Sequence, residues 1–194
     1  MQCLRSPLTA FPTITVVWLA ALALGGCESP TPATGPELHA SMQHARATHE
    51  SQLSGDTRRD IARLRQQTAQ FNRFEAAVEA GWNAPIPDCF ADPRLGGMGF
   101  HFGNPELIDG TVDVLAPELL VYEPQKNGRL RFVAVEYIVP FAAWTGAEPP
   151  ELYGQSFHRN EAFGIWVLHV WHMRENPQGI FADWNPKVSC QYAP

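Results

Sequence analysis

The dipeptide Asn127-Gly128, which lies between apolar runs at 119–125 and 129–139, constrains the fold more than any other feature of the sequence. Asn-Gly between alternating apolar residues is the strongest short-range signal for a β-hairpin. A third run at 163–173 is apolar on both faces, which is typical of a central strand. Residues 98–102 form a short fourth candidate strand. The sequence therefore predicts a mostly antiparallel sheet from about residue 85 onward.

A two-residue turn would set the register of this hairpin, with Leu119 opposite Glu136 and Glu123 opposite Phe132. Strand alternation then places Glu136 on one face with three apolar neighbours: Phe132, Ala134 and Ile138. A carboxylate on such a face either has a polar partner or has a raised pKa. Glu136 is therefore a candidate functional residue.

The segment 57–80 precedes the sheet and has the periodicity of an amphipathic helix. Five apolar residues fall on one helical face: Ile61, Leu64, Phe71, Phe74 and Val78. Asp56 or Thr57 is the expected cap, and Gly81 is the expected end. A weaker helical pattern covers 38–53. The predicted fold class is α+β, with an N-terminal helix or helical hairpin packed on a mostly antiparallel sheet.

The amino-terminal segment has the composition of an export signal. Arg5 is its only charge, residues 16–24 are apolar, and the small residues Gly25 and Gly26 follow. The apolar run is too short to cross a bilayer. We therefore expect residues 1–26 to be a signal peptide.

The sequence Leu24-Gly25-Gly26-Cys27 resembles the lipobox of bacterial lipoproteins. The resemblance implies cleavage before Cys27, attachment of lipid to the Cys27 thiol, and anchoring in the cell envelope. In a cell with two membranes, the outer membrane is the expected location. The alternative is an ordinary signal peptide in which Cys27 has no role.

The chain after the signal divides into two parts by composition. Residues 27–36 contain three prolines and few apolar side chains, so we expect a lipidated cysteine followed by a flexible tether. Residues 37–194 have the length of a single α+β domain.

The whole chain has a net charge of −6, which argues against a nucleic-acid partner. Six arginines between 46 and 73 favour a solvated helix face. A docking surface for envelope partners is the alternative.

The cysteines Cys89 and Cys190 are the pair that remains once Cys3 leaves with the signal and Cys27 carries lipid. An even pair in an oxidising compartment predicts a disulfide. A two-thiolate metal site is the alternative, but neither cysteine has a second ligand at the usual short spacing.

Histidines supply the candidate chemistry of the β-rich region. His101, Glu136 and His169 each lie on a different predicted strand, and together they form a ligand set for a divalent transition metal. His158, on an expected loop, is a possible additional ligand. His172 is three residues from His169 and should face the other side of the strand. Two other interpretations remain: a structural hydrogen bond between Glu136 and His169, and metal-free acid–base chemistry.

Several motifs between about 69 and 190 resemble those of a group of secreted bacterial proteins of unassigned function. The most specific are Gly-Met-Gly-Phe-His at 97–101 and Trp-Asn-Pro-Lys-Val-Ser-Cys at 184–190. The resemblance implies a single intact domain and gives no activity. The glycines at 96–99 lack the Lys-Ser/Thr of a phosphate loop, so we expect them to permit close backbone approach.

The expected function is that of an envelope lipoprotein that binds a small ligand or a metal at a pocket containing histidine and glutamate. Four tryptophans are candidate wall residues of that pocket: Trp144, Trp166, Trp171 and Trp184. A metal-dependent oxidoreductase or hydrolase using His101, Glu136 and His169 is one alternative. An interaction or structural protein of the envelope is the other. The expected partners are the membrane, through Cys27, and the small molecule or metal.

Overall fold

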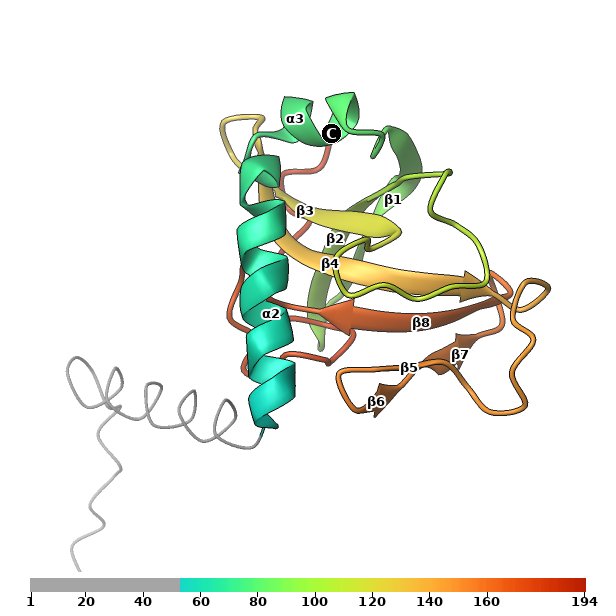
Figure 1. Ribbon diagram of the computed structural model, residues 1–194. Helices are drawn as coiled ribbons and strands as arrows, with labels where there is room; N and C mark the ends of the chain where they lie inside the picture. The colour runs from blue at the N-terminus through green and yellow to red at the C-terminus, as the bar shows by residue number, and fades with distance from the viewer. Residues whose placement is uncertain (1–52) are drawn as a thin grey trace, which may run out of the picture. The chain divides into compact units, whose positions relative to one another are not determined.

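The computed structural model describes residues 53–194 and has a long helix packed across one face of an antiparallel sheet (Figure 1). The expected α+β architecture is confirmed. The signal segment, Cys27, the tether and nearly all of the weaker helix at 38–53 lie outside the described residues. None of the helices within 53–194 has the length and apolarity that a membrane crossing requires.

The helical part begins at a capped residue and breaks into three pieces. These are α2 (Gly55–Thr68), a 3-10 turn (Ala69–Asn72) and α3 (Phe74–Glu79). Ser54 caps α2 by accepting a hydrogen bond from the Thr57 backbone N–H at 3.0 Å, so the expected caps Asp56 and Thr57 were wrong. Gly81, at φ 106°, follows α3 and ends the helical region as expected.

The expectation of one continuous helix over 57–80 was also wrong, and tertiary contacts explain the break. The Tyr122 hydroxyl donates to the Phe71 carbonyl at 2.8 Å, which gives this carbonyl a partner on the sheet. The Arg73 backbone is extended, at φ −91° and ψ 111°. These contacts direct Phe74 of α3 against the rings of Phe102 and Tyr122.

The main sheet has six antiparallel strands in the order β1-β2-β3-β4-β8-β7, and β5-β6 form a separate hairpin. The strand bounds are β1 (Ala84–Asp92), β2 (Gly96–Gly103), β3 (Leu119–Pro124), β4 (Leu130–Pro140), β5 (Glu151–Leu152), β6 (Gln155–Ser156), β7 (His158–Asn160) and β8 (Ile165–Val170). The largest apolar core lies between α2 and the sheet, and includes Ile61, Leu64, Leu120, Tyr137 and Val170.

The predicted β3–β4 hairpin is present, but its turn is longer than expected. Leu119 pairs with Glu136 as predicted, whereas Glu123 pairs with Arg131 and not with Phe132. The Gly128 N–H donates to the Gln125 carbonyl at 2.9 Å, and Gln125 pairs with Arg129, so three residues form the loop. A register shift at Val133 then compensates for the extra residue.

This bulge moves Phe132 to the opposite face from the one expected. Phe132 packs in the helix-side core, while Val133 and Ala134 pack with Trp171 and Val188 on the other face. Beyond the bulge the alternation resumes, and Ala134 and Ile138 share the face of Glu136 as predicted. The expected grouping of Phe132 with Glu136 was therefore wrong.

The carboxy-terminal segment after β8 crosses the face of the sheet opposite α2. Gly97 forms a backbone bridge with Asn185, and the predicted disulfide joins Cys89 of β1 to Cys190. A Cβ atom on Gly97 would lie 2.8 Å from the Val188 carbonyl oxygen. The expectation that glycines at 96–99 permit close backbone approach is therefore confirmed.

Candidate functional site

His101, Glu136 and His169 meet on the face of the sheet away from α2. They come from β2, β4 and β8, as the sequence predicted. Glu136 and His169 are direct cross-strand partners. His101 pairs with Val121 on β3, so its side chain approaches Glu136 across one intervening strand.

The three side chains are buried and close together. His101, Glu136 and His169 are 3%, 7% and 2% exposed. His101 Nε2 lies 3.1 Å from Glu136 Oε2, and His169 Nε2 lies 3.7 Å from Glu136 Oε1. One ligand atom from each residue falls within 4.8 Å of the others. The predicted convergence is therefore present.

The hydrogen bonding of this cluster is incomplete. Both ring nitrogens of His169 and Nδ1 of His101 are buried without a hydrogen-bond partner. The distance of 3.7 Å between His169 and Glu136 is too long for a hydrogen bond, so the structural pair considered from the sequence is not formed. Buried polar atoms without partners are costly, which makes this cluster unusual for a purely structural core.

The electrostatics favour the charged forms of Glu136 and His169 despite their burial. Burial acts to raise the pKa of Glu136, but attraction to His169 and His101, with a hydrogen bond from His101, lowers it below its ordinary value. Burial acts to lower the pKa of His169, but Glu136 and Asp183 raise it. The cluster thus holds an ionised carboxylate, and Nε2 of His169 can serve as a ligand once the imidazole loses a proton on metal binding.

Asp183 is the functional neighbour that sequence reasoning missed. Its Oδ1 lies 3.6 Å from His169 Nδ1, and its Oδ2 lies 3.4 Å from His158 Nε2. No periodic pattern marks residue 183, because it lies in the irregular carboxy-terminal segment. His158 lies on β7 and not on the expected loop, and it stays outside the three-residue cluster.

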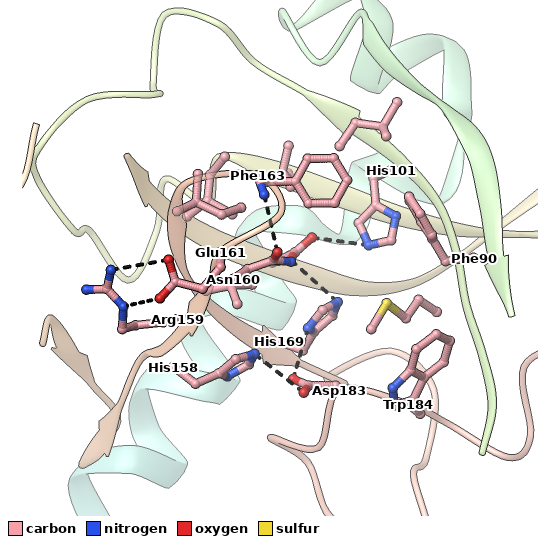
Figure 2. Close-up of a pocket in the computed structure, with 17 residues that line it drawn as sticks. Phe90, His101, His158, Arg159, Asn160, Glu161, Phe163, His169, Asp183 and Trp184 are labelled. Atoms are coloured by element: carbon pink, nitrogen blue, oxygen red, sulfur yellow. Dashed lines mark hydrogen bonds and ion pairs between the residues drawn. The ribbon is translucent and has the colours of Figure 1, made fainter. Parts of the chain in front are cut away.

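The cluster opens into a pocket of about 510 Å³, a size common for small-molecule sites (Figure 2). Of the four candidate tryptophans, only Trp184 lines this pocket. Trp171 stacks beside His169 with ring centroids 6.2 Å apart. Trp144 and Trp166 pack against the helix-side core instead.

Comparison of the chain with protein-family models, curated proteins and solved structures finds no match. The chemistry of the site therefore has to be argued from its geometry. Two imidazoles and a carboxylate on three strands form a ligand set suited to zinc, iron or another divalent transition metal. Donors around one ion at about 2.0–2.2 Å are at most about 4 Å apart, so a small side-chain rotation would bring the three into range.

Proposed function

We propose that this protein binds a divalent transition metal ion through His101, Glu136 and His169. The observation that carries the proposal is the convergence of three buried donors at one pocket while three histidine nitrogens have no hydrogen-bond partner. An ion would give Nε2 of His169 the partner that it lacks. The ion would also supply the positive charge beside Glu136, which a protonated His169 supplies when no metal is bound.

Asp183 has the placement of an outer partner for this metal site. It approaches Nδ1 of His169, which favours the tautomer whose Nε2 is free to bind the ion. His158 approaches the other Asp183 oxygen and orients the carboxylate. Carboxylate–histidine–metal arrangements of this kind are common in protein metal centres.

The test is a Co²⁺ titration of the purified full chain, followed by visible absorption and repeated with Zn²⁺ in competition. We expect one ion per chain. The near-isosteric variants His101→Gln, Glu136→Gln and His169→Gln should each weaken binding by at least about 100-fold. Glu161→Gln is the matched control, since this exposed carboxylate lines the same pocket, pairs with Arg159 and lies outside the cluster, and it should bind the ion within about threefold of the wild type. Equal binding by wild type and the three cluster variants would overturn the proposal.

A metal-dependent enzyme is the second candidate function. Three protein ligands leave a coordination position for water or substrate, as in catalytic zinc sites, and here the ligands face a pocket. The relaxation of solvent protons in Co²⁺-loaded protein distinguishes the two functions. An exchanging water on the ion supports the enzyme, and a closed coordination shell contradicts it.

We also propose that the protein is exported and anchored in the cell envelope by lipid on Cys27. Support comes from the lipobox resemblance at 24–27 and from the charge pattern ahead of it. Intact-mass analysis of the mature protein should give a diacylglyceryl group on Cys27, and Cys27→Ser should abolish the added mass. Mature protein with another amino terminus and no lipid would contradict the proposal.

The interaction-protein alternative has less support. In α2, Arg59 pairs with Asp56 and Arg63 pairs with Asp60. Arg65 donates to the His172 carbonyl at 2.7 Å, which ties the helix to the sheet. These contacts fit a solvated helix face with local ion pairs better than a basic docking surface.

A further inference from the structure

We infer that the pocket takes a small molecule with an apolar, aromatic body, whose single oxygen-chelating group binds the proposed metal ion. This inference rests on the proposed metal site and specifies its ligand. Its basis is the separation of polar and apolar side chains within the pocket.

The wall next to the cluster is apolar. Leu119, Ile138 and Val167, at most 6% exposed, surround Glu136 and His169 on the same sheet face. Ile86 on β1 and Ile165 on β8 extend this surface. A charged or strongly hydrated body placed here would lose its water without gaining hydrogen-bond partners. The body of the ligand must therefore be apolar.

Aromatic rings line one side of the path from the surface to the cluster. The rings of Phe163 and Phe90 meet edge to face, with their centroids 6.4 Å apart. The rings of Phe90 and His101 meet in the same way, with their centroids 5.6 Å apart. Figure 2 shows these rings together at one side of the pocket. Phe163 lies on the turn between β7 and β8 and is 58% exposed. Rings arranged edge to face suit a planar apolar guest.

The polar groups lie at the cluster, at the rim and along one side between them, where Asp183 is 3.6 Å from His169 and 3.4 Å from His158. The cluster of His101, Glu136 and His169 forms one end, and β7 with its following turn contributes His158, Asn160 and other polar residues at the rim. A divalent ion bound by one carboxylate retains a net positive charge, which attracts an anionic oxygen group. The ligand class is thus an apolar ring with one metal-binding oxygen group.

The test compares two probes that share a chelating group and differ by the ring: benzohydroxamate and acetohydroxamate. Calorimetry is done on the Zn²⁺-loaded full chain. We expect benzohydroxamate to bind at least about tenfold more tightly, since burial of the ring removes its apolar surface from water. Phe163→Ala should reduce benzohydroxamate affinity by about threefold or more and leave acetohydroxamate affinity unchanged.

The control variant is Tyr192→Ala, which removes another exposed aromatic ring, 45% exposed, that does not line the pocket. It should leave both affinities unchanged. Equal affinity for the two probes in metal-loaded protein would overturn this inference and leave the metal site standing. Benzohydroxamate binding that is equally tight without metal would overturn the assignment of the oxygen group to the ion. Failure of the wild type to take up metal, measured before any probe is added, would overturn the proposed function and this inference with it.

Discussion

At the scale of single residues, His172 is a buried histidine with a role unlike that of His169. Its Nε2 lies 2.9 Å from the Thr68 hydroxyl, and its carbonyl accepts a hydrogen bond from Arg65. Burial lowers the pKa of His172 to about 4, with a smaller contribution from the nearby Arg65 charge. His172 is therefore neutral at physiological pH and connects α2 to the end of β8.

This lowered pKa predicts a loss of stability in acid. The unfolded chain takes up a proton on His172 near pH 6.5, whereas the folded chain does so only near pH 4. The contribution of His172 to the free energy of unfolding is fully present above about pH 6.5. It falls by about 3 kcal/mol as the pH drops to about 4. Urea unfolding of the wild type and of His172→Gln should be measured across this pH range. The difference between their free energies of unfolding should shrink as the pH falls.

The half-exposed His158 supplies the control for that experiment. His158→Gln should keep the acid dependence of the wild type, because this variant retains the buried histidine at 172. If the free energy of unfolding changed with pH in the same way in the wild type and in His172→Gln, the assigned role of His172 would be contradicted.

The placement of His169 and His172 on opposite faces was predicted from strand alternation, and the structure has them on opposite faces. The reason is partly different, because β8 ends at Val170 and His172 lies in the bend that follows it. The role of Asp183 was not predictable, since an isolated aspartate in an irregular segment has no periodic neighbour to indicate its direction. The tertiary structure, and not a local sequence pattern, places Asp183 next to His169.

At the scale of secondary-structure elements, β2 positions the site through its glycines. A Cβ atom on Gly99 would lie 2.5 Å from the Tyr122 carbonyl oxygen on β3, and Gly99 has φ 109°. Gly99 is two residues from His101 in the same strand. Close contact between β2 and β3 therefore helps to set how far His101 reaches toward Glu136.

Substitution of Gly99 should disturb both stability and the site. Gly179 is the matched position, with φ 112° and nothing within 4 Å of a Cβ atom. Gly179→Ala should lower the unfolding free energy by about 1–3 kcal/mol through backbone strain alone. Gly99→Ala should lower it by about 1–3 kcal/mol more, because the added methyl group meets backbone.

The same pair of variants tests the positioning of His101. Co²⁺ affinity should fall in Gly99→Ala and stay at the wild-type value in Gly179→Ala. Equal losses of stability in the two variants, measured by urea unfolding, would show that the close approach of β2 to β3 has no energetic consequence.

The elements themselves were only partly predictable, and the hairpin shows why. Asn127-Gly128 located the turn, but the choice between two and three loop residues depends on a compensating bulge at Val133. That bulge is stabilised from outside the hairpin, since the Val133 carbonyl accepts hydrogen bonds from the backbone N–H groups of Met173 and Arg174. The break after α2 likewise depends on Tyr122, which is far away in sequence.

At the scale of the whole molecule, the carboxy-terminal segment closes the site from the face opposite α2. It carries Asp183 and Trp184 to the pocket and is held by several contacts to the sheet. The Ser189 N–H donates to Glu123 of β3 at 3.1 Å, and Asn185 forms a backbone bridge with Gly97 of β2. Within the segment, Arg174 donates to the Lys187 carbonyl at 2.9 Å. The disulfide between Cys89 and Cys190 adds a covalent link between this segment and β1.

This disulfide should contribute strongly to the stability of the fold. The bonded cysteines lie 101 positions apart in the sequence, and closing a loop of about 100 residues removes much of the entropy of the unfolded chain. The double variant Cys89→Ser/Cys190→Ser should lower the unfolding free energy by about 4–5 kcal/mol on this account. Its core between α2 and the sheet is intact, so the variant should still fold. The control is the wild type unfolded under reducing conditions, and its free energy of unfolding should fall by the same amount. A loss below about 1 kcal/mol in both would mean that the noncovalent contacts of the segment already hold it, and that the bond adds little to the fold.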